Sequence, residues 1–130
     1  MAATTCILVV DDQPALQASI GLTLELAGYT VAMATDGIEA IEVLEARRID
    51  LIIADIAMPR MDGHELCRRV RMHSRWGTLP FLFLTARAPE SECGDNQGCG
   101  PNAYLLKPIQ PEDLLSAIQH HLEPAQSRAV

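Results

Sequence analysis

The stretch ILVVDD, residues 7–12, decides the fold. Four aliphatic residues run directly into two adjacent carboxylates, Asp11 and Asp12. A continuous aliphatic run of this length is typical of a strand that is covered on both faces, as in a parallel sheet. Two like charges at the end of such a strand repel each other unless something positive lies between them. The stretch therefore predicts a buried strand that presents its carboxylates to a cation.

Four further aliphatic runs follow, and helix-length segments separate them. The predicted strands are 6–10, 30–34, 51–54, 81–84 and 103–106. The predicted helices are 14–27, 37–47, 63–73, about 89–97 and 111–123. This alternation predicts an α/β fold of the (βα)5 type with a five-stranded parallel sheet.

Helix boundaries follow from local signals. Pro14 and Pro111 suit first helical turns, and the pairs Asp36/Glu39 and Asp62/Glu65 have the spacing of capping boxes. Gly28 has the position of a residue that closes the first helix, for which Asp12 is a candidate N-cap. The glycine-rich stretch 89–101 predicts a short or mobile fourth helix, and 124–130 has no periodicity and predicts a tail.

Length and charge limit the function. A chain of 130 residues is most simply one domain, and the formal charge of −7 argues against direct binding to nucleic acid. We interpret the nearest approach to a basic patch, formed by Arg68, Arg69, Arg71 and Arg75, as the solvated face of a helix. No stretch predicts a membrane span or a signal peptide, so we expect a cytoplasmic protein. The cysteines, Cys6, Cys67, Cys93 and Cys99, lack metal-site spacing and are interpreted as free thiols.

Polar residues follow four of the predicted strands. Asp11 and Asp12 come after the first strand, Asp55 after the third, Thr85 after the fourth and Lys107 after the fifth. The carboxyl ends of parallel strands share one edge of the sheet, which is where such folds bind ligands. Oxygen ligands of this kind suit a hard divalent cation, most plausibly Mg²⁺. The set predicts a phosphoryl site, with Asp55 as the nucleophile that forms an acyl phosphate.

Each of these residues alone has an ordinary structural explanation. An acid pair after a strand is often only a helix cap, and a single Asp, Thr or Lys at a strand end carries little information. The joint pattern favours function, because unrelated surface residues have no reason to fall at the ends of four strands.

The motifs together resemble the receiver domain of two-component response regulators over about residues 5–123. The resemblance is carried by VVDDQP (9–14), IIADIAMPRMDG (52–63), FLFLTA (81–86) and AYLLKP (103–108). It implies a flavodoxin-like strand order 2-1-3-4-5 and a single receiver domain over 1–130. It also implies that Asp55 is phosphorylated by a histidine kinase or phosphotransfer protein, and that a downstream effector protein or a removed output domain responds.

The resemblance also assigns roles to individual residues. It implies that Asp12, Asp55 and the backbone carbonyl of Ala57 hold Mg²⁺, with Asp11 acting through water. It implies that Thr85 and Tyr104 form a switch pair, that Ala57 and Arg87 tune the phosphoryl lifetime, and that the Lys107–Pro108 peptide bond is cis. The sequence departs from the family in GCGPNAY (98–104) and in its glycine-rich fourth helix. This puts in doubt whether the signal is passed on through the face that the family usually uses, which the fourth helix, fifth strand and fifth helix form.

The first helix carries a second apolar stripe. Leu16, Ile20, Thr23, Leu24 and Ala27 form the face expected against the sheet, and Ala15, Ala18, Leu22 and Leu26 then face water. Either the leucines are isolated exposed residues, or the stripe docks on a helical partner. In receivers the first helix is a usual contact for the phosphodonor, so the resemblance implies that the stripe docks on a helical partner.

Two other functions compete with a phosphoacceptor. A phosphatase of the haloacid dehalogenase type also uses an aspartate nucleophile, but it needs an acid two residues later, where this chain has Ala57. A receiver-like binding module that is never phosphorylated would not need Asp55, Thr85 and Lys107 together. We therefore expect a signalling domain and not a turnover enzyme.

Overall fold

The computed structural model describes residues 5–56, 58, 61–85 and 103–128. Its elements in chain order are β1 (Cys6–Val10), α1 (Pro14–Leu26), β2 (Thr30–Ala34), α2 (Gly37–Ala46), β3 (Leu51–Asp55), α3 (Gly63–Met72), β4 (Phe81–Thr85), β5 (Ala103–Leu106) and α4 (Pro111–Arg128). The five predicted strands are confirmed, and β3 and β4 are each one residue longer than predicted. The predicted helix 89–97, together with Cys93 and Cys99, lies outside the described residues.

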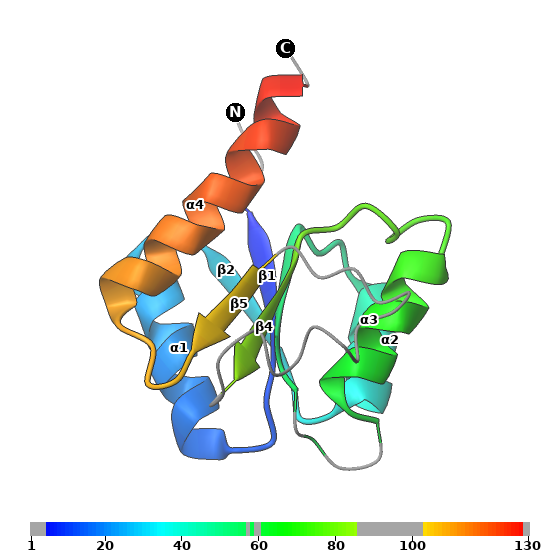
Figure 1. Ribbon diagram of the computed structural model, residues 1–130, viewed down its shortest axis with the longest axis horizontal. Helices are drawn as coiled ribbons and strands as arrows, with labels where there is room; N and C mark the ends of the chain where they lie inside the picture. Colours follow the sequence, from blue (N-terminus) through cyan, green and yellow to red (C-terminus); the bar gives the residue numbers. More distant parts are fainter. Residues whose placement is uncertain (1–4, 57, 59–60, 86–102, 129–130) are drawn as a thin grey trace.

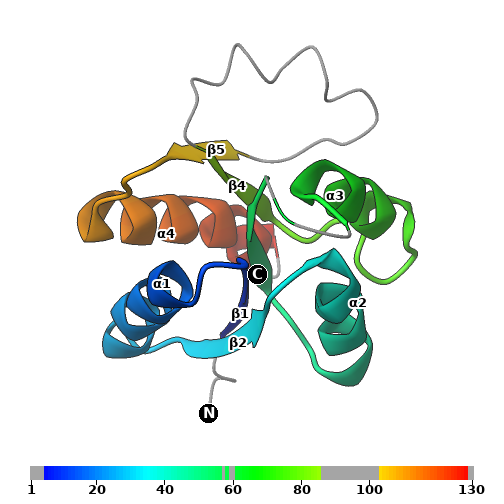
Figure 2. The ribbon, with the colours of Figure 1, turned by 90° about the horizontal axis from the view of Figure 1, so that it is seen from below.

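The strands form one parallel sheet in the order β2-β1-β3-β4-β5, which confirms the predicted fold class. Helices α1 and α4 lie on one face of this sheet, and α2 and α3 lie on the other (Figure 1). The same two layers are visible along the strands in Figure 2. Within the described ranges, no helix has the length and apolar composition that a membrane crossing requires.

Strand β1 lies in the middle of the core and shows why the sheet forms. Ile7 and Val9 pack on the side of α1 and α4, whereas Leu8 and Val10 pack on the side of α2 and α3, and all four side chains are fully buried. Alternate side chains of a strand point to opposite faces, so a strand covered twice needs apolar residues at every position. The aliphatic run of β1 is therefore a consequence of the two helix layers.

Three predicted helix boundaries are confirmed. The side chain of Asp36 accepts a hydrogen bond from the Glu39 backbone N–H at 2.8 Å, and Asp62 accepts one from the Glu65 N–H at 2.9 Å. Gly28 adopts a φ of 100° and closes α1, a conformation that side chains with a Cβ rarely adopt.

The prediction that Asp12 caps α1 was wrong. Gln13 occupies the N-cap position and makes no side-chain capping bond, while its N–H donates to Asp11 Oδ1 at 2.8 Å. The turn after β1 is thus held by the first aspartate of the pair, which leaves the exposed Asp12 without a capping role. The helix also ends one residue early, and Ala27, predicted to face the sheet, is exposed.

Two further predictions were wrong. Helix α4 continues to Arg128, so the residues after Glu123 are helical and do not form an irregular tail. Pro124 removes one backbone donor, but the Ala and Gln that follow it favour helix. Arg71 is not part of a solvated face, because it is half-buried and donates to the carbonyl oxygens of Gly77 and Leu79 at 3.1 and 2.6 Å.

Candidate functional site

The carboxyl ends of four strands bring the predicted polar residues to one edge of the sheet. Asp55 is the last residue of β3 and Thr85 the last of β4, while Asp11 and Lys107 follow β1 and β5. Backbone hydrogen bonds continue past the strands, from Asp11 N to the Ala34 oxygen at 3.0 Å and from Lys107 N to the Thr85 oxygen at 2.8 Å. The hydrogen bonds of the sheet therefore fix the backbone positions of these residues.

Three carboxylates meet at this edge, as predicted. One oxygen each of Asp11, Asp12 and Asp55 can be chosen so that all three lie within 4.8 Å of one another. Asp11 and Asp55 are buried, whereas Asp12 is exposed. Three negative charges this close require a compensating cation.

Lys107 provides one such cation. Its Nζ lies 2.7 Å from Oδ2 of Asp55, and the two side chains are 22% and 9% exposed. A short charge-assisted hydrogen bond in a partly desolvated site is stronger than the same pair in water. The peptide bond between Lys107 and Pro108 is cis, as the resemblance implied.

Lys107 alone does not compensate the negative charge of the Asp11 carboxylate. Its Oδ1 accepts from the Gln13 N–H, but among the residues that the structure describes no donor reaches its buried Oδ2. Burial raises the pKa of the Asp11 carboxyl, and the charge of Asp55 adds to this, while the Gln13 hydrogen bond and Lys107 oppose it. A buried oxygen without a donor, beside two further carboxylates, fits a hard divalent cation as ligand.

Thr85 and Tyr104 lie on neighbouring strands. Thr85 is buried at the end of β4, and Tyr104 of β5 is half-buried and in register with Phe83. The rings of Tyr104 and Phe83 are 5.6 Å apart, and the ring of His64 from α3 lies 5.1 Å from Phe83. The ring of Tyr104 thus packs on the face of the sheet that α2 and α3 cover.

Two residues that support the site were not identified from the sequence. Gln17 of α1 donates from Nε2 to the Ala34 oxygen at 2.9 Å, which ties α1 to the end of β2. A Cβ on Gly63 would lie 2.6 Å from the Asp55 backbone oxygen, so only glycine lets α3 start this close to Asp55. In the sequence, the Asp-Gly pair at 62–63 could have indicated that Gly63 starts a helix close to another segment. Gln17 could have been noticed as a polar residue on a turn of the first helix that faces the core.

The second stripe of α1 is exposed, as predicted. Ala15 and Ala18 face solvent, and Leu22 and Leu26 are 58% and 80% exposed. At Ala15 the stripe borders a groove of about 960 Å³ between α1 and α4, which the two leucines do not line. Asp12 and Lys107 line the end of this groove, so it connects the stripe to the acid cluster.

Ala57 and Arg87, predicted to tune phosphoryl lifetime, lie outside the described residues. The same holds for the Ala57 carbonyl as a metal ligand.

The comparisons with known proteins agree with the geometry of the site. The family profile of the response regulator receiver domain matches residues 7–119. This chain is a receiver domain. Response regulator MprA of Mycobacterium ulcerans (strain Agy99) is 43% identical over 113 residues, which cover 87% of this chain and 48% of MprA. The receiver thus spans about half the length of that curated relative.

Solved receivers have the same fold. Chemotaxis response regulator CheY4 of Vibrio cholerae is 37% identical, with a TM-score of 0.86 over 92% of this chain and all of that one. The receiver domain of sensor histidine kinase PA1611 from Pseudomonas aeruginosa PAO1 is 32% identical, with a TM-score of 0.85 over 93% of this chain and 99% of that one. That structure has a magnesium ion coordinated in its active site cleft.

The raised pKa of Asp11 predicts how stability depends on pH. A raised pKa means that the folded receiver binds more protons than the unfolded chain, so this group lowers stability as pH rises. Asp11→Asn should therefore raise the free energy of unfolding of the metal-free receiver at neutral pH. The gain should vanish below the ordinary Asp pKa of 3.8, where the carboxyl is protonated in both states.

Urea unfolding in the presence of a chelator measures this difference. Asp62→Asn is the matched control, because Asp62 is exposed and Asn caps a helix equally well. An Asp11→Asn variant that is less stable than the wild type at neutral pH without metal would contradict the electrostatic account.

Proposed function

We propose that this receiver is a phosphoacceptor in which Asp55 takes a phosphoryl group from a phosphohistidine of a histidine kinase or phosphotransfer protein. The observation that carries the proposal is the contact between Lys107 Nζ and Asp55 Oδ2 at 2.7 Å, beside the carboxylates of Asp11 and Asp12. In this arrangement one carboxylate contacts an ammonium and lies close to two further carboxylates, which would help to bind a cation.

The transfer is a substitution at phosphorus. An oxygen of Asp55 forms the new P–O bond, and the P–N bond to the imidazole breaks, which returns the histidine to its neutral form after it gains a proton from solvent. The product is an acyl phosphate on Asp55. Lys107 moves its ion pair from the carboxylate to the phosphoryl oxygens and so stabilises the charge that the transfer delivers.

Mg²⁺ is the proposed cofactor. Asp11, Asp12 and Asp55 would hold it, with the Ala57 carbonyl as a further ligand that the family resemblance implies. When bound, the ion neutralises the acid cluster and the phosphoryl oxygens. The magnesium ion in the receiver of PA1611, a relative at 32% identity, supports this choice.

Thr85 and Tyr104 are the proposed switch pair. Thr85 ends β4, which pairs with β3 where Asp55 lies, and its hydroxyl would donate to an added phosphoryl oxygen. Movement of that strand end changes the space available to the Tyr104 ring, which packs against Phe83 of the same strand. Ala57 and Arg87 stay predictions as residues that tune the lifetime of the phosphoryl group.

The proposed role is signalling without turnover of a substrate, in the cytoplasm. The downstream partner is an effector protein or an output domain, since the MprA relative is a response regulator of about twice this length. The position two residues after Asp55 is Ala57 and not an acid, which leaves a phosphatase of the haloacid dehalogenase type without its general acid.

The exposed stripe of α1 is the proposed docking surface for the phosphodonor. Leu22 and Leu26 supply apolar area, and Ala15 and Ala18 permit a helix to approach closely. The adjoining groove leads to Asp12 and Lys107. A helical partner on this surface would bring its phosphohistidine over the acid cluster.

Replacing the nucleophile tests the central residue. Asp55→Asn should abolish acyl-phosphate formation with acetyl phosphate and Mg²⁺, because an amide oxygen is a far weaker nucleophile than a carboxylate. Intact-protein mass spectrometry detects the adduct. Asp62→Asn serves as the control and should be labelled like the wild type, and undiminished labelling of Asp55→Asn would sink the assignment.

Charge on the stripe tests the docking surface. Leu22→Glu with Leu26→Glu should slow phosphotransfer from the protein partner by about tenfold or more, because two carboxylates are placed in an apolar contact. Labelling by acetyl phosphate should stay unchanged.

The matched control is Ile38→Glu with Met72→Glu, which adds the same charge at exposed positions on the other side of the sheet. It should leave both rates unchanged. Equal slowing in both double variants, or no slowing by the α1 pair, would contradict a docking role for this stripe.

A further inference from the structure

Basic residues are distributed unevenly in this chain. Seven of its ten Lys and Arg residues lie between positions 47 and 75, whereas 14–26 and 111–127 contain none. In the fold, α2 and α3 lie on one side of the sheet, and α1 and α4 lie on the other (Figure 2). Residues 47–75 carry seven basic and four acidic side chains, so this part of a chain with a net charge of −7 is locally positive, although α2 itself adds three glutamates.

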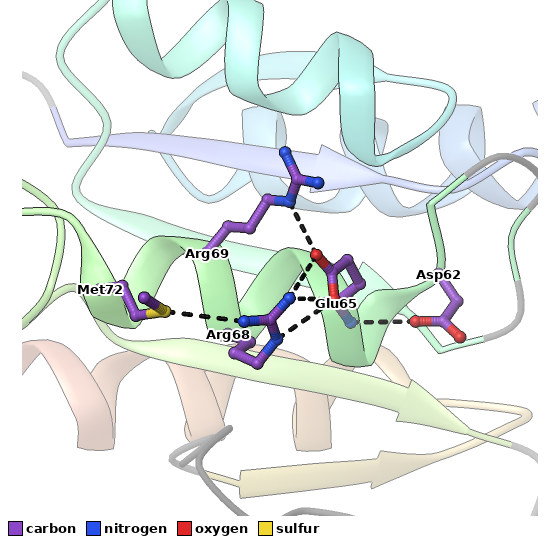
Figure 3. A network of polar contacts seen from close by, with 5 residues as sticks. All are labelled: Asp62, Glu65, Arg68, Arg69 and Met72. Atoms are coloured by element: carbon purple, nitrogen blue, oxygen red, sulfur yellow. Dashed lines mark hydrogen bonds and ion pairs between the residues drawn. The ribbon is translucent and has the colours of Figure 1, made fainter.

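The arginines on this side differ in their partners. Glu65 binds Arg68 Nη2 at 2.7 Å and Arg69 Nε at 2.8 Å, and these contacts hold the pKa of Glu65 below its usual value (Figure 3). Arg47 makes one side-chain contact, with Cys6 Sγ at 3.7 Å. Among the described residues, no carboxylate lies within ion-pair distance of Arg47 or Arg75.

These two unpaired guanidinium groups line one cleft. It has a volume of about 560 Å³ and lies between the turn after α2, which carries Arg47 and Arg48, and the segment between α3 and β4, which carries Arg75 and Trp76. Both segments precede their strands, so the cleft is at the amino end of the sheet, opposite the acid cluster. The length of β3, five residues or roughly 17 Å, separates the two sites.

Both walls of the cleft are held in place. Arg71 binds the carbonyl oxygens of Gly77 and Leu79, and the ring of His73 stacks on Trp76 with centroids 3.7 Å apart. The opposite wall is tied to β1, where the Asp50 carboxylate accepts from the Cys6 N–H at 2.9 Å. The arginines therefore extend from a fixed frame, which reduces the entropy that a ligand would have to remove.

We propose that this cleft is a docking site for an acidic segment of a partner protein, with Arg47 and Arg75 as the anchors for its carboxylates. Guanidinium groups bind carboxylates in paired hydrogen bonds, and Arg47 and Arg75 have that capacity unused. The buried Trp76 and the half-buried Leu79 provide an apolar floor.

The lining favours separate carboxylates over phosphate groups. Glu45 and Asp50 lie in the same cleft, and the carbonyl end of α2 adds partial negative charge. A compact polyanion cannot contact the arginines without approaching these acidic groups, which repel it. Carboxylates spaced along a peptide can contact the arginines and avoid the acids.

The site is independent of the phosphorylation chemistry. A partner in the cleft leaves Asp55 and the α1 stripe accessible, because they lie at the other end of the sheet and on its other face. One receiver can therefore hold a partner here while it is phosphorylated.

Fluorescence anisotropy at low ionic strength tests the proposal. The probe is a short fluorescein-labelled peptide of alternating Asp and Glu, and its Asn/Gln counterpart is the uncharged control. The wild-type receiver should bind the acidic probe only, and Arg47→Gln with Arg75→Gln should weaken binding by about tenfold or more.

Arg68→Gln with Arg69→Gln removes the same charge from arginines already paired with Glu65, and it should change the affinity by less than about twofold. Circular dichroism and acetyl phosphate labelling should be unchanged in both variants. No saturable binding by the wild type, or equal weakening in the two double variants, would overturn the proposal. Tighter binding of pyrophosphate or of a short DNA duplex than of the acidic peptide would assign the cleft to phosphate groups and overturn it as well.

Discussion

The ion pair between Lys107 and Asp55 is the interaction on which the rest of the site depends. Three carboxylates at the buried edge of a sheet oppose folding through their desolvation and mutual repulsion. The Lys107 ammonium, 2.7 Å from the Asp55 carboxylate, offsets part of that cost. The rest remains at Asp11, whose buried Oδ2 has no donor among the described residues. The site is therefore stable enough to fold, and the charge that is left uncompensated is what the proposed cation and phosphoryl group would use.

The fold separates this chemistry from recognition. The carboxyl ends of the strands hold the reactive groups, the apolar stripe of α1 borders the groove that leads to them, and the unpaired arginines line a cleft at the amino ends. Because the sheet is covered on both faces, each surface uses a different helix layer. In the scheme proposed above, one small domain offers separate surfaces for a phosphodonor and for a second partner.

Most of the fold and the acid cluster could be predicted from the sequence. Strands that are covered by helices on both faces are continuous aliphatic runs, and the carboxyl ends of parallel strands lie at the same edge of the sheet. The errors concern residues whose role depends on how the neighbouring turn or loop folds, which the local pattern does not reveal. Arg71 looks like a surface arginine, and only the loop folded over it supplies the Gly77 and Leu79 carbonyls. The Asp12 cap failed because Asp11 holds the turn, and the closeness of Gly63 to Asp55 depends on how α3 docks.

The most direct test is the stability of Lys107→Met with and without Mg²⁺, measured by urea unfolding. In a chelator the variant should be less stable than the wild type, on the order of 1 kcal/mol, because three carboxylates then lack their cation. Mg²⁺ should stabilise the variant more than the wild type, since the ion no longer competes with an ammonium for Asp55. Equal stability in the chelator, or a smaller gain from Mg²⁺ in the variant, would contradict the account.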